Sequence, residues 1–151
     1  YLVPAFSGLG APYWRSDVSA ALVGMSRTTT KAEVVKAGLE CIAYQITDIV
    51  KLMAEAAGIE ELELRVDGGP TRNKFLMQFQ SDILNCTVQV PDAEELSGIG
   101  AAYAAGLGAG IYGEDVFNSM KYTPFTPKMD EETRQKKYGG WQDAVAMLLK
   151  R

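Results

Sequence analysis

The 151 residues carry a net charge of −4, and 47% of them are hydrophobic, which is typical of one globular domain with a real core. The acidic balance offers no basic surface for nucleic acid or an anionic membrane, so we expect neither partner. The sequence contains no histidine, which excludes Ser-His and Cys-His nucleophiles within these residues.

Cysteine usage and the ends of the chain give further limits. Cys41 and Cys86 are too few for a disulfide framework and lack the spacing of a zinc site, so we interpret them as reduced core cysteines of a cytoplasmic protein. The chain starts at Tyr1 without a basic and apolar leader, and we expect it to be part of a longer protein. The uncharged segment 96–112 is too short and too rich in Gly and Ala for a membrane span.

In chain order, the first two apolar runs, at 1–6 and 19–26, predict two strands joined by a long structured loop. The loop contains a lone GxG, at Gly8 and Gly10, which is not the dinucleotide-binding fingerprint.

From Thr30 onward, apolar residues recur every three or four positions, which predicts a long helix with one buried face. Thr30 and Glu33 form a capping box at its start, and Gly58 provides a left-handed end. Such a helix is about 40 Å long, enough to cover a whole sheet. The predicted buried face consists of Val35, Leu39, Ile42, Ile46, Ile49 and Met53.

Alternating residues at 61–67 predict a strand that ends at Asp67, where Gly68 and Gly69 make a tight corner. We expect Thr71 to cap a second helix that ends near Asn85. A short strand ended by Pro91 follows.

The last third predicts two more helices. The Gly/Ala segment forms one, with small residues spaced by four that let a neighbour approach closely, at Gly98, Ala102, Gly106 and Gly110. Residues 123–128 are expected to be a linker, and residues 130–150 a helix with Trp141, Val145 and Leu148 turned inward.

Strands alternate with helices in this order, which predicts an α/β fold with parallel strands and right-handed crossovers. Only two strands are covered by these helices, and so small a sheet hardly buries the apolar faces of three helices. We therefore expect part of the sheet to lie before Tyr1.

The corner at 67–69 is the best candidate for a site, because ligands of open parallel sheets bind at the carboxyl ends of strands. Free backbone amides beside glycines suit a nucleotide or its phosphates. The side-chain amide of Asn73 can both donate a hydrogen bond to a purine edge and accept one from it. Taken alone, two glycines after a strand are more often a simple turn. Asp67 fits either a cap of the next turn or a magnesium ligand.

Four separated segments carry a resemblance to a known family. They are "VPAFSGLGAPYW", "ALVGMSRTTTKAEVVKAGLECIAYQ", "LRVDGGPTRNKFLMQFQSDILNCTVQVP" and "GAAYAAGLGAGIY". In this order they resemble the carboxyl-terminal domain of the FGGY carbohydrate kinases. The resemblance runs from Tyr1 to about Tyr112 and is closer to the glycerol-phosphorylating branch than to the xylulose-phosphorylating branch.

This resemblance implies a ribonuclease-H-like ATPase domain of the actin and hexokinase type, present over 1–151 as a partial domain that lacks its first strands. It implies ATP and Mg²⁺ as cofactors and phosphorylation of a polyol or sugar hydroxyl, with glycerol as the leading acceptor. The alternatives are a kinase for a ketose or sugar acid, such as xylulose or gluconate, and a catalytically inactive ATP-binding module.

By the same resemblance, Gly69 lies along the adenosine, Asn73 contacts the adenine, and Gly68 is their neighbour. The general base, the phosphate-binding turn and the acceptor-binding residues are expected before Tyr1. We therefore expect no catalytic and no metal-binding residue here, and no activity from this chain alone. The implied partners are an amino-terminal kinase domain and further copies of the protein in a homo-oligomer.

Overall fold

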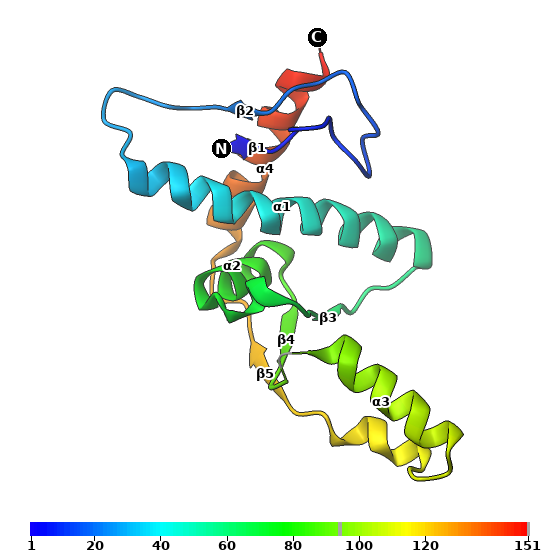
Figure 1. Ribbon diagram of the computed structural model, residues 1–151. Helices are drawn as coiled ribbons and strands as arrows, with labels where there is room; N and C mark the ends of the chain where they lie inside the picture. The colour runs from blue at the N-terminus through cyan, green and yellow to red at the C-terminus, as the bar shows by residue number, and fades with distance from the viewer. Residues whose placement is uncertain (94, 151) are drawn as a thin grey trace.

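The computed structural model describes residues 1–93 and 95–150, with two small sheets and four α-helices among them (Figure 1). The elements in chain order are β1 (Leu2–Val3), β2 (Ala21–Leu22), α1 (Lys31–Ala57), β3 (Glu63–Arg65), η1 (Gly69–Arg72), α2 (Lys74–Leu84), β4 (Thr87–Pro91), α3 (Leu96–Gly108), η2 (Glu114–Ser119), β5 (Tyr122–Phe125) and α4 (Glu131–Leu149).

The strand pairing confirms the predicted hairpin and the predicted parallel pair. β1 runs antiparallel to β2, and β3 runs parallel to β4 with Leu64 opposite Val88. The predicted linker at 123–128 is wrong in its first half, because β5 pairs antiparallel with β4 and places Pro124 opposite Gln89. Proline is tolerated in β5 because this strand lies at the edge of the three-stranded sheet.

The ends of the helices follow the sequence closely. Thr30 and Glu33 make the reciprocal capping box of α1, and Gly58 ends α1 in the left-handed conformation with φ 65°. Asn85 ends α2 in the same conformation with φ 57°. Local chemistry therefore fixes where these helices begin and end.

The face of α1 that is buried is not the predicted one. The six apolar residues expected to be buried are exposed or only half-buried, and Met53 is 65% exposed. The side of α1 that packs against the described chain carries Tyr44, Thr47 and Asp48 instead. Because α1 packs mainly against α2 and β1, its apolar side stays largely uncovered by residues 1–93 and 95–150.

The core gathers around Tyr44, which joins three helices. Its ring stacks on Trp141 of α4 at 5.3 Å between centroids and meets Phe79 of α2 edge-on at 5.4 Å. Trp141 and Tyr44 are almost wholly buried, and Val145 and Leu148 are also buried, as predicted for α4. Aromatic contacts of this kind add to the stabilisation from apolar burial.

Beside this cluster, the carboxylate of Asp48 accepts three hydrogen bonds. Its Oδ2 accepts from the Tyr13 hydroxyl at 2.9 Å and from Nε1 of Trp141 at 2.8 Å, and its Oδ1 accepts from the Tyr138 hydroxyl at 2.6 Å. Burial, followed by the bond to Asp48, raises the pKa of both tyrosines above the usual 10.0, so both remain protonated donors. One side chain thus ties the loop after β1, helix α1 and helix α4 together.

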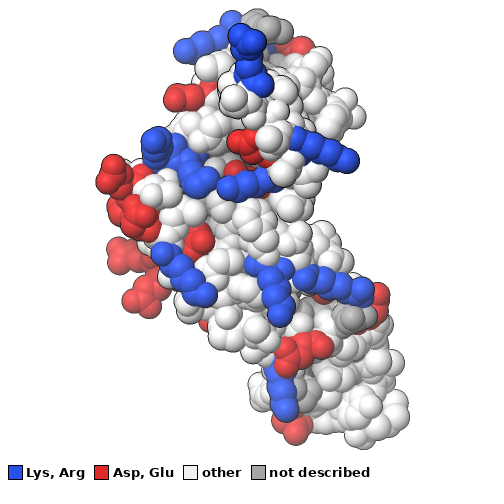
Figure 2. Space-filling model, turned by 90° about the vertical axis from the view of Figure 1, so that its left-hand side faces the viewer, with Lys and Arg blue, Asp and Glu red and all other residues white. Residues whose placement is uncertain are grey.

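Helix α3 and η2 pack against each other and project from the rest of the molecule (Figure 1). Figure 2 shows that this lobe, at the bottom of the view, carries few charged side chains. The predicted close approach of a neighbour along the ridge of small residues is not seen among the described residues, because Gly98, Ala102 and Gly110 are exposed. Of these four described residues, only Gly106 has a close neighbour, the ring of Tyr112, which folds back on the end of α3. Within the described part of the chain, no helix is long and apolar enough to cross a bilayer.

We predict that Asp48→Ala lowers the free energy of unfolding by about 3–5 kcal/mol, because the buried Trp141 and the half-buried Tyr13 and Tyr138 lose their acceptor at once. Urea unfolding followed by the fluorescence of buried Trp141 measures the loss. Asp143→Ala, an exposed carboxylate on the same helix as Trp141, is the matched control and should change stability by less than about 0.5 kcal/mol. Equal effects of the two substitutions would show that Asp48 does not hold the fold together.

Candidate functional site

A cavity of about 230 Å³ lies where the parallel strands β3 and β4 end. Its walls come from the corner after β3, from the end of β4 and from the start of α3. The lining residues are Gly68, Gly69, Thr71, Arg72, Val90, Pro91, Asp92, Ala93 and Glu95. This is the ligand position expected of an open parallel sheet, and it contains both predicted glycines.

The local structure of the corner differs from the prediction. β3 ends at Arg65, and the corner continues into the short 3₁₀ helix η1, with no α-helix directly after it. Thr71 therefore lies inside η1, where its hydroxyl donates to the Gly68 carbonyl at 2.8 Å, and does not cap α2. The interpretation of Asp67 as a cap is also wrong, because Gly68 is the N-cap of η1.

The two glycines have different reasons to be glycine. Gly68 has φ +99°, a conformation that L side chains rarely adopt, so the turn itself requires it. Gly69 has no such angle, and a Cβ built on it would meet nothing within 4 Å. The fold therefore does not explain the absence of a side chain at Gly69, whereas a ligand packed against its backbone would.

Asn73 was predicted to lie in the first turn of the helix, but it is the N-cap of α2. Its Oδ1 accepts a hydrogen bond from the Leu76 amide at 3.2 Å, so its acceptor is committed to the helix. The amide nitrogen of the same side chain is left as a donor. Asn73 follows η1 directly but is not part of the cavity wall.

The charge around the cavity is mainly negative. Among the described residues that line it, Asp92 and Glu95 are acidic and Arg72 is basic, and Asp67 precedes the corner. Carboxylates repel a polyphosphate and suit the uncharged nucleoside half of a nucleotide. The wall formed by β4 and Glu95 was not predicted, although the meeting of parallel strand ends at one sheet edge was the available signal.

The described residues form no cluster of metal ligands. Among residues 1–93 and 95–150, no group of three or more His, Cys, Asp or Glu could hold a metal ion. Magnesium that binds together with a nucleotide needs only one or two carboxylates besides the phosphates. Asp67 is exposed at the corner, and its role as a magnesium ligand stays a prediction.

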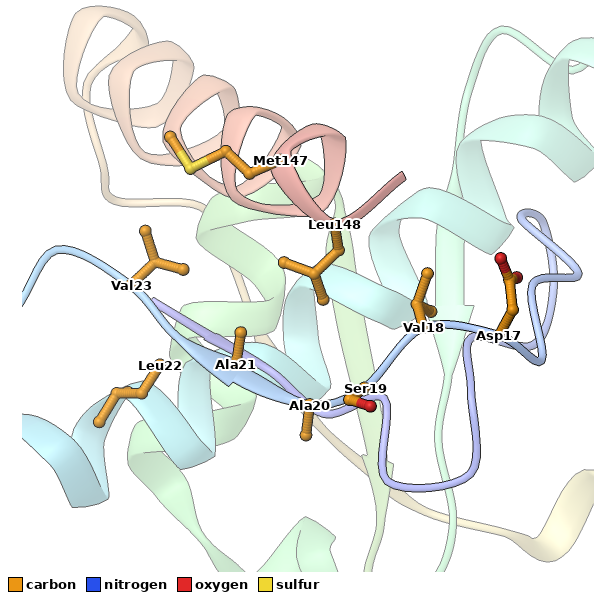
Figure 3. Close-up of a pocket in the computed structure, with 9 residues that line it drawn as sticks. All are labelled: Asp17, Val18, Ser19, Ala20, Ala21, Leu22, Val23, Met147 and Leu148. Carbon is orange, nitrogen blue, oxygen red and sulfur yellow. The ribbon is translucent and has the colours of Figure 1, made fainter. Parts of the chain in front are cut away.

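A larger cavity of about 480 Å³ lies between the β2 segment and α4 (Figure 3). It is lined by Asp17–Val23 and by Met147 and Leu148, and Figure 3 shows mostly aliphatic side chains around it. Asp17 forms a bidentate pair with Arg15, which lowers the pKa of its carboxyl to about 2. This cavity lacks the converging polar groups of a specific small-molecule site.

The chain belongs to the FGGY family of carbohydrate kinases, because residues 1–109 match the carboxyl-terminal domain of that family. Within the family it is similar to glycerol kinases. It is 47% identical to glycerol kinase of Staphylococcus epidermidis and 49% identical to glycerol kinase 1 of Thermotoga maritima. The matches cover 96% and 99% of this chain but only 30% and 31% of those relatives.

Solved structures agree with this assignment. A crystal structure of Plasmodium falciparum glycerol kinase with ADP matches with a TM-score of 0.87 and 42% identity, over 98% of this chain and 30% of that chain. The xylulose kinase of Lactobacillus acidophilus, at 19% identity, shares the fold with a TM-score of 0.83, over 98% of this chain and 31% of that chain. The expected fold class is thereby confirmed: the chain is a partial ribonuclease-H-like domain of the kinase type.

We predict that Gly68→Ala and Gly69→Ala affect stability differently, because the backbone requires glycine only at Gly68. Gly68→Ala should lower the free energy of unfolding by about 1–2 kcal/mol, because alanine is strained at a positive φ. Gly69→Ala should leave it within about 0.5 kcal/mol of the unsubstituted protein, because its Cβ has open space. Thermal or urea unfolding measures both changes. A clear loss of stability in Gly69→Ala would show that the turn itself requires glycine at this position.

Proposed function

We propose that residues 1–151 are the carboxyl-terminal nucleotide-binding domain of a longer, ATP-dependent kinase that phosphorylates glycerol, and that this chain forms the wall against which adenosine binds. The similarity to glycerol kinases at 47–49% identity supports the acceptor, and a glycerol kinase of the same fold with ADP supports the nucleotide. Xylulose and gluconate are the alternative acceptors, and kinases for both share the fold.

The observation that carries the proposal is the bare surface at Gly69. Folding does not require a glycine there, yet Gly69 lines the cavity at the strand ends together with Val90 and Pro91. A flat purine or ribose can approach such a backbone surface closely, while apolar side chains pack against its other side. The site is therefore built for a planar, largely uncharged group.

The charge distribution gives the nucleotide a direction. Because Asp92 and Glu95 line the cavity, the nucleoside half enters it and the phosphates point away from this chain. Asn73 contributes only donors, since its oxygen caps α2, and therefore reads a ring nitrogen acceptor of the base. Mg²⁺ accompanies the phosphates and has its ligands outside these residues.

The rest of the proposed kinase supplies what this chain does not. An amino-terminal domain holds the general base and the acceptor site, and transfer of the γ-phosphoryl depends mainly on positioning and charge stabilisation across the cleft between the domains. We place the protein in the cytoplasm, in keeping with the two free, buried cysteines, Cys41 and Cys86. Phe6 and Trp14, each 79% exposed, favour a homo-oligomer.

We predict that Gly69→Val and Asn73→Asp in the full-length kinase raise the KM for ATP and leave the KM for glycerol unchanged. Valine fills the space meant for adenosine. Aspartate keeps the oxygen that caps α2 but loses the amide donor, which should cost about 2- to 10-fold in KM.

Gly139→Val is the matched control for the first of these variants. A Cβ at Gly139, on α4, also meets nothing within 4 Å, so valine is tolerated there without touching the cavity. Steady-state kinetics with both substrates measures all three variants. An ATP KM that stays unchanged in Gly69→Val and Asn73→Asp would place the nucleotide elsewhere.

We also predict that residues 1–151, made alone, do not transfer phosphate to glycerol, xylulose or gluconate from Mg-ATP. The reaction needs both walls of the cleft, and this chain provides one. A coupled assay for ADP release measures the activity. Acceptor-dependent ADP release that Asn73→Asp abolishes would show that the catalytic groups lie within these residues.

A further inference from the structure

The cavity at the strand ends contains a carboxylate that the fold itself does not use. Glu95 lines this cavity and stands at the N-cap position of α3, but its side chain makes no capping hydrogen bond. Glutamate is not among the residues preferred at an N-cap, where Ser, Thr, Asp and Asn satisfy the first amides of a helix. The start of α3 therefore does not explain a glutamate at this position.

Two other polar side chains of the same wall are already engaged. Oδ1 of Asp92 accepts a hydrogen bond from the Thr123 hydroxyl of β5 at 3.1 Å. The Thr71 hydroxyl donates its proton to the Gly68 carbonyl at 2.8 Å. Within the described part of the chain, the side chain of Glu95 has no hydrogen-bond or ion-pair partner, so both of its oxygens are free to accept from a ligand.

Two free carboxylate oxygens determine which chemical group they can bind. An ionised carboxylate accepts hydrogen bonds and donates none, so its partner must carry donors. In the nucleoside half of ATP, the donors are the two ribose hydroxyls and the amino group of adenine. The two hydroxyls are neighbours on one ring, so a single carboxylate can accept from both, one with each oxygen. Acidic side chains bind ribose hydroxyls in this way in other nucleotide sites.

The positions of Asn73 and Glu95 favour the ribose over the amino group of adenine. Asn73 lies between η1 and α2 and outside the cavity wall, whereas Glu95 belongs to the wall at the start of α3. A base bound by the amide of Asn73 lies on the α2 side of the corner. The sugar attached to that base then lies over Gly69, on the side of Glu95, and the phosphates point away from the carboxylate, which repels them.

We propose that Glu95 is a specificity-determining residue of the nucleotide site, whose carboxylate accepts hydrogen bonds from the ribose hydroxyls and so selects ribonucleotides over deoxynucleotides. This inference rests on the proposed function of the chain and adds the group that reads the sugar. The two carboxylates of the wall then have different tasks: Asp92 ties the end of β4 to β5, and Glu95 binds the ribose.

Steady-state kinetics of the full-length kinase with ATP and with 2′,3′-dideoxy-ATP tests the proposal. Glu95→Ala removes the acceptor, and Glu95→Gln keeps one neutral acceptor oxygen. Asp92→Ala is the matched control, because it removes the same charge from the same cavity but not the proposed contact with the ribose. The quantity compared is the ratio of kcat/KM for the two nucleotides, which a general disturbance of the fold does not change.

We expect the unsubstituted protein to prefer ATP by at least about tenfold, because hydrogen bonds to a charged acceptor are lost with the dideoxy sugar. Glu95→Ala should bring the ratio close to one by raising the KM for ATP, Glu95→Gln should give a ratio between these values, and Asp92→Ala should leave the ratio unchanged.

A ratio that Glu95→Ala leaves unchanged, or that Asp92→Ala lowers equally, would overturn the proposal. An equal rise of both KM values in Glu95→Ala would also overturn it, because the carboxylate would then act on the base or the phosphates, which the two nucleotides share. These results are distinct from a failure of the proposed function, in which Gly69→Val also leaves the KM for ATP unchanged.

Discussion

The carboxylate of Asp48 is the interaction on which the arrangement of this chain depends. It is 8% exposed and accepts from one residue of the first loop and two residues of α4, segments that are far apart in the sequence. A buried carboxylate is costly unless its oxygens are satisfied, and three donors satisfy this one. α1 is thereby held in a single rotation about its axis.

That rotation determines which side chains of α1 pack against α2 and α4. On its inner side, Tyr44 packs between Phe79 of α2 and Trp141 of α4, which sets the position of α2. α2 in turn packs on β4, whose end forms one wall of the cavity, and Asn73 at the start of α2 follows the glycine corner. The orientation of α1 therefore influences the geometry of the candidate site, because α1 positions α2 and α2 packs on β4.

The elements were predictable from the sequence, and their environment was less so. The capping box at Thr30, the left-handed end at Gly58 and the helix end near Asn85 depend on local chemistry and were predicted correctly. The parallel strands were predicted correctly from the alternation of strands and helices. The prediction of which face of α1 is buried was wrong, because periodicity shows that an apolar side needs cover but not which part of the polypeptide provides it. β5 was missed because its Pro124 is typical of a linker, whereas an edge strand accepts it.

For the site, the sequence indicated the corner but not its surroundings. Gly68 and Gly69 were predicted together, and the structure separates a glycine that the backbone needs from one that it does not. The acidic wall at Asp92 and Glu95 depends on β4 lying beside β3, which no local pattern specifies. A crystal structure of the full-length protein with ADP would test the central claim, that this chain forms the adenosine wall, most directly. The account predicts the nucleoside against Gly69, with the amide nitrogen of Asn73 about 3 Å from a ring nitrogen of adenine and the phosphates directed away from Asp92. A nucleoside bound in the cavity beside β2, or anywhere away from this corner, would contradict it.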